Sequence, residues 1–358
     1  MTIRIPIARP ELGPEESAAV AEVLQSGMLV SGRLVEAFER GLAERCGRRY
    51  AVCVANGTAA LELALRALGV DAGEVLVPAL SWPSPAHMAA WVGATPRLVD
   101  VDPATWNGTA ATLAAARSEA TRCAIAIDQF GVPADHAAIA DALGDLAVVE
   151  DAACAIGSTL DGRPCGSFGE VSCLSFHPRK VVTTGEGGAC LTDDDGLADQ
   201  LRVLRNHGQR GVGDFALAGP NERLTEMQAA IGLVQLDRLD AMIERRRRIC
   251  DAYRDALPGL GLAYQAHPAG ARVNEQTFGC LAPSADDRDR IVAGLREGGI
   301  GAGILSYAMT RIGSLAHLGQ SAPVAEDVEA RGLALPVYPA MTDADVADVL
   351  AALAEAVG

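Results

Sequence analysis

The chain has a single lysine, Lys180, so nearly all of its positive charge comes from arginine. Codon bias in a GC-rich genome would explain this, and the abundance of alanine, without any bearing on function. Even so, chemistry that needs a lysine amine has one possible position. Lys180 ends the segment Ser175–Lys180, in which Pro178 prevents simple continuation of the preceding strand. We therefore expect Lys180 on an irregular loop at the edge of a sheet.

Two adjacent carboxylates, Glu150 and Asp151, directly follow another apolar run, 146–149. Ligands of open parallel sheets bind at the carboxyl ends of the strands, so a carboxylate here is placed to contact a ligand. The alternative, which this segment alone leaves open, is that it caps the turn through Ala152 and Ala153. The glycine-rich stretch 183–188 could let the backbone approach a bound group, although such a turn indicates little by itself.

The elements that must position these residues alternate between helical and strand patterns in the first half of the chain. This alternation predicts parallel βαβ units, and so an α/β fold with helices on both faces of the sheet. Helices are expected at 14–25, 35–45 and 59–67. Strands of a sheet of about seven are expected at 50–54, 75–78, 97–101, 123–127, 146–149, 171–176 and 189–192.

The second half begins with a long helical pattern, 224–257. Its basic run, Arg245–Arg248, is expected to form a solvated face near a domain junction. Weaker patterning follows, with a strand at 277–281, a helix at 286–297 and a last helix at 343–357. We therefore predict a large domain over residues 1–245 and a smaller C-terminal α+β domain over 246–358.

Composition excludes several classes of protein. At 49% hydrophobic residues over 358 positions, the chain can bury a large core, which excludes disorder as its main state. Its formal charge of −16 should repel nucleic acid and anionic lipid. It shows no signal-peptide pattern and no apolar run of about 18 residues, so we expect a cytoplasmic protein without a membrane span. Nine cysteines without CxxC spacing predict reduced, mostly buried thiols, and neither disulfides nor a metal site.

Ordered motifs along most of the chain resemble the DegT/DnrJ/EryC1/StrS family of sugar aminotransferases, which are fold-type I enzymes dependent on pyridoxal 5′-phosphate (PLP). The motifs are Gly32, Phe38-Glu39, Asn56–Leu61, Val77-Pro78, Val99–Asp102, Phe130-Gly131, Glu150–Ala153, Ser175–Gly188, Arg205–Gly208, Asn221–Ala230 and Leu335–Thr342. The resemblance implies a large domain with a mainly parallel seven-stranded sheet between helices, followed by the smaller C-terminal domain.

The resemblance also implies roles around the cofactor ring. Lys180 would be the Schiff-base residue and proton carrier, which an arginine could not be because it stays protonated. Asp151 would pair with the pyridinium nitrogen and keep it protonated. Trp82 would stack on one face of the ring and Ala153 would pack on the other. Cys154 stands where family members commonly have Gln or His, and is a weaker partner for the phenolic oxygen.

The phosphate of PLP would rest on Gly57, Thr58 and Ala59 at a helix N-terminus, with a hydroxyl from Ser175. By the same resemblance, Asn221 would reach the phosphate of the neighbouring subunit, so a homodimer would share its two active sites. A simpler alternative is that Asn221 caps the helix that begins near residue 224.

The resemblance predicts transfer of an amino group from L-glutamate or L-glutamine to a keto group of a nucleotide-linked sugar. A cyclitol or other polyol ketone from antibiotic biosynthesis is the alternative acceptor, because the family's His-Tyr-Pro segment appears here as Ser306-Tyr307-Ala308. Lys180 argues against the branch that dehydrates keto-sugars, which carries His at the Schiff-base position. A PLP-binding regulator without turnover would need a further binding segment, for which the sequence gives no sign.

Overall fold

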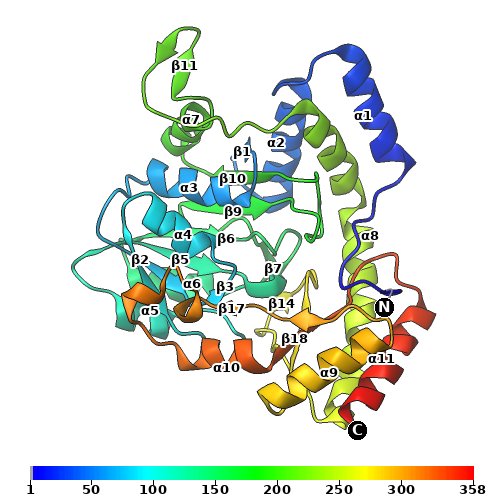
Figure 1. Ribbon diagram of the computed structural model, residues 1–358. Coiled ribbons are helices and arrows are strands. Elements are labelled where there is room, and N and C mark those ends of the chain that lie inside the picture. The colour runs from blue at the N-terminus through cyan, green and yellow to red at the C-terminus, as the bar shows by residue number, and fades with distance from the viewer. Residues whose placement is uncertain (1–2) are drawn as a thin grey trace.

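The computed structural model describes residues 3–358 and is built around one large sheet with helices on both of its faces (Figure 1). The strand order is β1-β10-β9-β6-β5-β2-β4, and β10 alone runs antiparallel to its neighbours. All seven predicted strands are present, so the prediction of a mainly parallel seven-stranded sheet is confirmed. Their bounds are β1 Tyr50–Val54, β2 Glu74–Pro78, β4 Thr95–Val99, β5 Thr121–Ile127, β6 Ala147–Asp151, β9 Val171–Ser175 and β10 Gly188–Thr192.

Each strand sends alternate side chains into two different cores, because side chains along a strand point to opposite faces. In β1, Val52 and Val54 join the core under α3, α4 and α7, whereas Ala51 and Cys53 join the core under α2 and α8. The helices α5 and α6 cover the remainder of that second face. The helix bounds are α1 Pro14–Ser26, α2 Arg33–Cys46, α3 Gly57–Ala67, α4 Ser84–Trp91, α5 Ala110–Ala116, α6 His136–Leu143, α7 Asp195–Leu204 and α8 Glu226–Ala256.

The C-terminal part contains a smaller antiparallel sheet in the order β13-β15-β18-β16, covered by α9 and α11. Its bounds are β13 Ala263–Tyr264, β15 Phe278–Leu281, β16 Gly303–Ile304, β18 Gly332–Leu335, α9 Ala285–Glu297, α10 Pro323–Arg331 and α11 Asp343–Val357. The N-terminal residue Ile5 pairs with Ile300 and lies in the core of this part. The expected domain boundary at residue 245 falls inside the continuous helix α8, and it stays a prediction.

Short strand pairs connect the two parts of the molecule. In one of them, β17 (Tyr307–Ala308) pairs with β3 (Leu80–Ser81), and in another β14 (Ala271–Arg272) pairs with β7 (Thr159–Leu160). The strand β8 (Arg163–Pro164) extends the second pair. A separate hairpin of β11 (Gln209–Gly211) and β12 (Asp214–Phe215) projects beyond α7 (Figure 1). Segments remote in sequence are therefore brought beside the carboxyl ends of the main sheet.

The prediction that Arg245–Arg248 form a solvated face is wrong for most of the run. Arg246 is 3% exposed and donates hydrogen bonds to the carbonyl oxygens of Glu275, Gln276 and Val337. Arg245 and Arg247 also donate to carbonyl oxygens of the C-terminal part, and only Arg248 is exposed. These arginines hold α8 against the smaller sheet, because several backbone acceptors there need donors.

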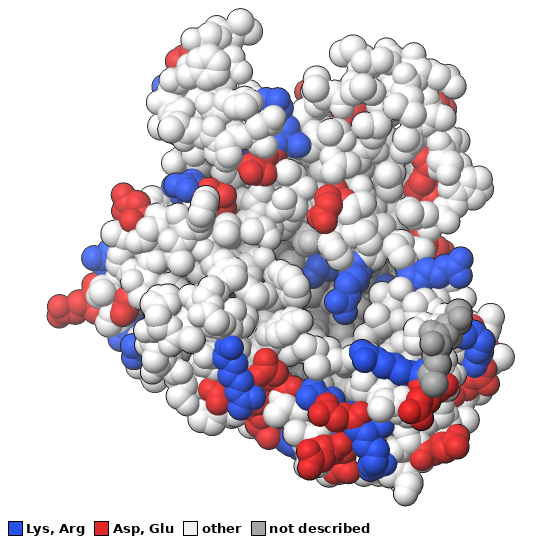
Figure 2. All heavy atoms as spheres, in the orientation of Figure 1, with Lys and Arg blue, Asp and Glu red and all other residues white. Residues whose placement is uncertain are grey.

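Charged side chains and cysteines differ in where they lie in the structure. Figure 2 shows acidic and basic side chains interspersed over the lower, C-terminal part of the molecule. The nine cysteines are free thiols, and all except the half-buried Cys154 are buried. Within residues 3–358, no helix is both long and apolar enough to cross a membrane.

Candidate active site

Lys180 lies in the loop that connects β9 to β10, as the proline at position 178 predicted. The loop is closed on itself by backbone hydrogen bonds, in which Phe176 N–H donates to Gly187 O and Thr184 N–H donates to Phe176 O. Lys180 N–H donates to His177 O over 2.8 Å within a tight turn. This framework holds a flexible side chain at the carboxyl end of the sheet.

The amine of Lys180 contacts the turn that follows β6. Its Nζ donates to Cys154 Sγ over 3.0 Å, and both side chains are half-buried. Burial raises the pKa of Asp151 to about 6, while the nearby charge of Lys180 opposes that rise. The structure therefore brings together Lys180, Asp151 and Cys154, which the sequence placed in two separate segments.

Asp151 is the last residue of β6 and is 6% exposed. Its Oδ1 accepts a hydrogen bond from Ala153 N–H over 3.1 Å, so the turn-capping alternative is part of its role. In the described chain its other carboxylate oxygen accepts no hydrogen bond, and it remains free for a ligand. A carboxylate buried in this way suits a cationic partner such as a protonated ring nitrogen.

A cradle for a phosphate lies at the start of α3. Asn56 caps this helix by accepting from Ala59 N–H over 2.8 Å, which leaves the N–H groups of Gly57 and Thr58 without a partner in the described chain. A Cβ on Gly57 would lie 2.8 Å from Ser175 Cβ, so only glycine allows this approach. Free amides at a helix N-terminus favour an anion. Gly57 and Thr58 therefore fit the phosphate of PLP. The N–H group of Ala59, which was also expected to bind it, already donates to Asn56.

Trp82 follows β3 and is 63% exposed. It contacts the ring of Tyr307 edge-on, with 5.8 Å between the ring centroids, and the pairing of β3 with β17 holds the two segments together. Gln129 Nε2 also donates to Ser306 Oγ, at 3.4 Å. The segment 306–308, which departs from the family pattern, thus lies beside Trp82. The sequence showed that this segment departs from the family pattern, but it did not predict the contact between Trp82 and Tyr307.

Asn221 lies on an exposed loop, apart from the Lys180 cluster within one chain. The loop is fixed by a bridge from Asn221 to Asn206 and by Ala55 N–H, which donates to Glu222 O over 2.9 Å. The N-cap of α8 is Thr225, whose hydroxyl accepts from Gln228 N–H. Asn221 therefore does not cap this helix, and its predicted contact with the partner's cofactor stays a prediction.

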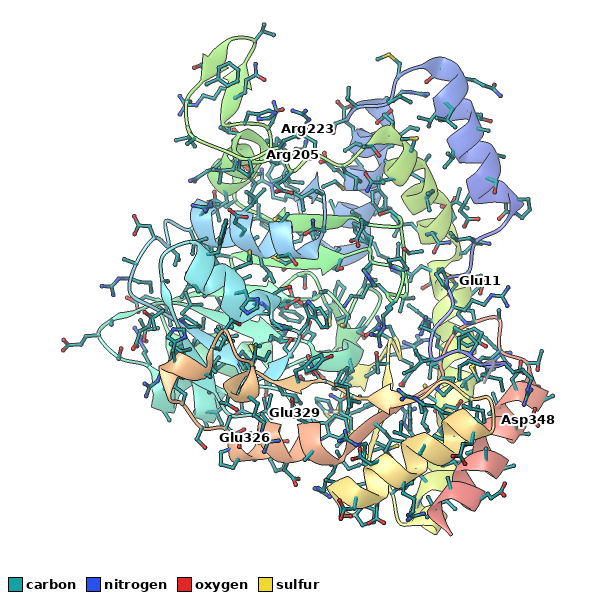
Figure 3. All side chains as sticks on the ribbon, in the orientation of Figure 1. Glu11, Arg205, Arg223, Glu326, Glu329 and Asp348 are labelled. Atoms are coloured by element: carbon teal, nitrogen blue, oxygen red, sulfur yellow. The ribbon has the colours of Figure 1, made fainter. Side chains whose placement is uncertain are left out.

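A cavity of about 780 Å³ lies next to this loop. Arg205 and Arg223 lie at its floor, between the β11 hairpin and α2 (Figure 3). Asp199 is the one acidic residue in its lining, which otherwise includes Val30, Ser31, Arg202, Val203, Arg205, Asn206, Gln209, Arg210 and Arg223. Arg202 pairs with Asp199 and Arg205 pairs with Glu39, whereas Arg210 and Arg223 form no ion pair within the described residues and are available to an anion.

Sequence reasoning missed two buried residues below the site, Asp128 and His136. They form an ion pair at 2.7 Å next to Glu150 and Asp151. Asp128 directly follows the predicted strand 123–127, and that position was the only available signal. His136 carried no pattern of its own.

The comparisons with known proteins agree with this geometry. A model of the DegT/DnrJ/EryC1/StrS aminotransferase family matches residues 10–354. GDP-perosamine synthase of Caulobacter vibrioides is 36% identical, with 98% of this chain and 97% of the relative covered. DesV of S. venezuelae, solved with a ketimine intermediate, has a TM-score of 0.94 at 32% identity over 99% of this chain and 98% of its own. A candidate sugar aminotransferase of Streptococcus pneumoniae, solved in its PLP form, has a TM-score of 0.94 at 26% identity, covering 99% and 98%.

The fold and the site therefore define a PLP-dependent aminotransferase of fold-type I. The chain belongs to the DegT/DnrJ/EryC1/StrS aminotransferase family, whose members include sugar aminotransferases. The resemblance of the motifs is confirmed over nearly the whole chain, and so are the fold class and the cofactor.

Proposed function

We propose that this enzyme moves an amino group from L-glutamate or L-glutamine to a keto group of a nucleotide-linked sugar, with Lys180 as its Schiff-base residue. One observation carries the proposal: the only lysine of the chain lies against the turn that bears the buried Asp151. A lysine amine and a buried carboxylate are the two groups that PLP chemistry requires at opposite ends of the ring.

The residues of the chain divide the work of such a reaction. PLP, when bound, supplies a ring that accepts electron density from the substrate carbon. Lys180 Nζ would take a proton from that carbon and deliver it to the cofactor, since its amine lies against the turn that bears Asp151. Asp151 would hold the proton of the ring nitrogen. Gly57 N–H, Thr58 N–H and the Ser175 hydroxyl would bind the phosphate, and Trp82 with Ala153 would hold the ring between them.

The arginines that line the cavity favour the proposal of an acceptor that carries phosphate over that of an uncharged cyclitol. Asn221, which we propose to reach the partner's PLP phosphate, pairs with Asn206 in the wall of this cavity. In a homodimer with shared active sites the cavity would therefore border the partner's site. Arg210 is exposed and forms no ion pair within the described residues, so its guanidinium can bind a diphosphate.

The acceptor class is tested by supplying PLP-loaded enzyme with glutamate or glutamine and a panel of keto-sugar nucleotides and cyclitol ketones. Aminated product is measured by mass. We expect product from a nucleotide-linked sugar, and an Arg210→Gln variant should raise KM for that acceptor by about tenfold without changing KM for the donor. Arg248→Gln, a change at an exposed arginine of α8, is the matched control. Product from cyclitol ketones alone would contradict the proposed acceptor.

A further inference from the structure

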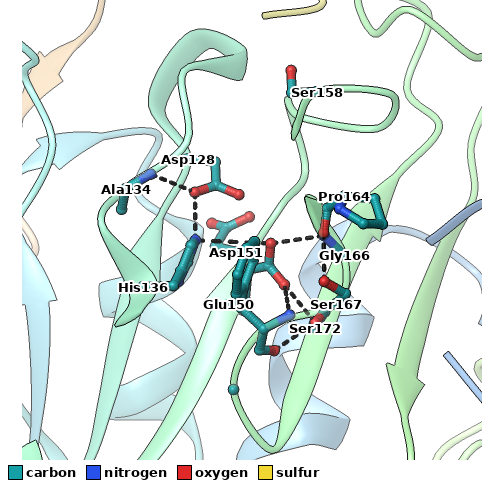
Figure 4. Close-up of polar contacts among 12 residues, drawn as sticks. Asp128, Ala134, His136, Glu150, Asp151, Ser158, Pro164, Gly166, Ser167 and Ser172 are labelled. Carbon is teal, nitrogen blue, oxygen red and sulfur yellow. Dashed lines mark hydrogen bonds and ion pairs between the residues drawn. The ribbon is translucent and has the colours of Figure 1, made fainter. Parts of the chain in front are cut away.

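Four titratable side chains lie buried at the carboxyl ends of β5 and β6. Asp128, Glu150 and Asp151 are at most 6% exposed, and His136, at the start of α6, is 4% exposed. Asp128 and Asp151 are neighbours across the two strands, because Asp128 N–H donates to Asp151 O over 3.1 Å. Figure 4 shows their carboxylates next to one another, with His136 and Glu150 below them. Asp151, which we propose to contact the cofactor, therefore lies next to three other buried titratable side chains. We call the four side chains the buried network.

Hydrogen bonds within the buried network hold the Asp128 side chain in one orientation. Its Oδ1 accepts from His136 Nε2 over 2.7 Å and from Ala134 N–H over 2.9 Å. The imidazole of His136 is stacked on Phe168, with 4.3 Å between ring centroids and 9° between planes. Although burial opposes protonation, the charge of Asp128 raises the pKa of His136 above its usual range. The contact with Asp128 therefore favours the protonated form of His136, and His136 Nε2 holds the carboxylate in place.

One oxygen of that carboxylate is left unpaired. In the described chain, Asp128 Oδ2 is buried and has no hydrogen-bond partner. Leaving a buried acceptor unsatisfied costs free energy, so such an atom calls for a functional explanation. Asp128 is also one of the groups that raise the pKa of Asp151, after burial as the largest cause. The negative charge of Asp128 therefore acts on the protonation equilibrium of Asp151.

Although the ligand atoms of Asp128, His136 and Glu150 lie within 4.8 Å of one another, Glu150 is held in a network of hydrogen bonds. Its carboxylate accepts from Gly166 N–H, Phe168 N–H and the Ser172 hydroxyl at 2.7, 2.8 and 2.6 Å. These bonds commit the Glu150 oxygens, as His136 and Ala134 commit Asp128 Oδ1. N–H and O–H groups that point at the Glu150 oxygens occupy the positions that a cation would need, so they favour a hydrogen-bonded network.

We propose that Asp128, oriented by His136, is a positioning residue that strengthens the hold of Asp151 on the protonated ring nitrogen of PLP. The inference rests on the proposed role of Asp151. A second negative charge near Asp151 and the ring raises the affinity of this pair for the proton that they share, so the proton is lost to solvent only at higher pH. The other charged or titratable groups that face the network are Cys46, Arg48, Arg163, Cys165, Cys173 and Lys180.

The test follows the ring nitrogen directly. Wild-type and Asp128→Asn protein are loaded with PLP labelled with ¹⁵N in the ring, and the ¹⁵N chemical shift is recorded against pH. Without the Asp128 charge, we expect the pKa of the ring nitrogen to fall by about one unit or more. Asp135→Asn is the matched control. It removes an exposed charge next to His136, and the amide can still accept the Ala138 N–H that Asp135 caps.

A second readout needs no cofactor. In apoprotein, ¹⁵N spectra of the imidazole recorded against pH should show a lower pKa of His136 in Asp128→Asn than in wild type, because the charge of Asp128 raises that pKa. If Asp128→Asn does not fold, the double variant Asp128→Asn/His136→Gln removes both buried charges together, and it should show the same change at the ring nitrogen.

The outcomes separate this inference from the proposed function. If Asp151→Asn leaves the ring nitrogen as protonated as wild type does, the proposed role of Asp151 fails. If Asp151→Asn lowers the pKa of the ring nitrogen but Asp128→Asn titrates like wild type, the inference about Asp128 is overturned. One equivalent of tightly bound metal at Asp128, His136 and Glu150 would overturn it as well.

Discussion

Lys180 Nζ lies 3.0 Å from Cys154 Sγ, so the one lysine of the chain donates to the one half-buried thiol among its nine cysteines. The contact joins the loop after β9 to the turn after β6. It places a thiol against the amine that we propose to bind the cofactor. Cys154 is therefore an internal probe of this site.

The first prediction uses the accessibility of Cys154. Iodoacetamide should modify the apoprotein at about one thiol per chain, because the other cysteines are buried. Mass analysis of peptides should locate the label at Cys154, and PLP loaded beforehand should protect it. Cys154→Ser is the control and should take up almost no label. Equal labelling of several cysteines would contradict the exposure that the structure gives them.

A second prediction concerns the stability of the apoprotein. Burial raises the pKa of Asp151 to about 6, above its ordinary value near 4. Between these values the folded state binds more protons than the unfolded state, so stability falls as pH rises through this range. Asp151→Asn should remove that loss and raise the free energy of unfolding of the apoprotein at pH 8 by on the order of 2 kcal/mol.

Denaturant unfolding at pH 4 to 8 measures this effect. The variant should show a weaker pH dependence than wild type and, when loaded with PLP, should lose most of its aminotransferase activity. An Asp151→Asn apoprotein that is less stable than wild type at pH 8 would contradict the claim that burial of the ionised carboxylate destabilises the apoprotein.

Gly57 gives the third prediction. A methyl group there would lie 2.8 Å from Ser175 Cβ, so Gly57→Ala must displace the start of α3 or the end of β9. We expect PLP affinity to fall by about tenfold or more and stability to fall by about 1–3 kcal/mol. Gly313→Ala, at a glycine with open space around it, should leave both unchanged. Fluorescence titration with PLP and denaturant unfolding supply the two measurements.

The fourth prediction tests shared active sites. If Asn221 reaches the partner's cofactor, a heterodimer of Lys180→Ala with Asn221→Ala has one site with both lesions and one site with neither. Equal mixing with random exchange should then recover about a quarter of wild-type activity, by the symmetry of a two-fold dimer. No recovery, once mass analysis has shown that heterodimers form, would place Asn221 in its own subunit's site or in none.

The main elements could be predicted because their signals are local. The strand Tyr50–Val54 and the helix Asp343–Val357 begin and end as predicted. For the helix, Thr342 caps it and Asp345 completes the capping box, so the signal lies in neighbouring residues. Lys180 and its loop were indicated by the single lysine and by Pro178, whereas Trp82 and Asn221 were indicated only by the family motifs, because no periodicity marks a loop.

The rest depended on contacts between distant segments. Arg246 was misread because its acceptors, which include Val337 O, lie far along the chain. Asp128 and His136 were missed although only eight residues separate them, because the irregular segment that brings them together carries no periodic pattern. A charge within the sequence says nothing of its partner until the fold brings the two together.

The central claim, that Lys180 carries the cofactor, is tested most directly by reduction with borohydride. PLP-loaded protein should be yellow, and reduction should fix one phosphopyridoxyl group per chain on the peptide that contains Lys180. The measurement is clear because the chain offers no other lysine. Lys180→Ala should take up no reducible adduct and should not turn over. An adduct or turnover that persists in Lys180→Ala would contradict the account.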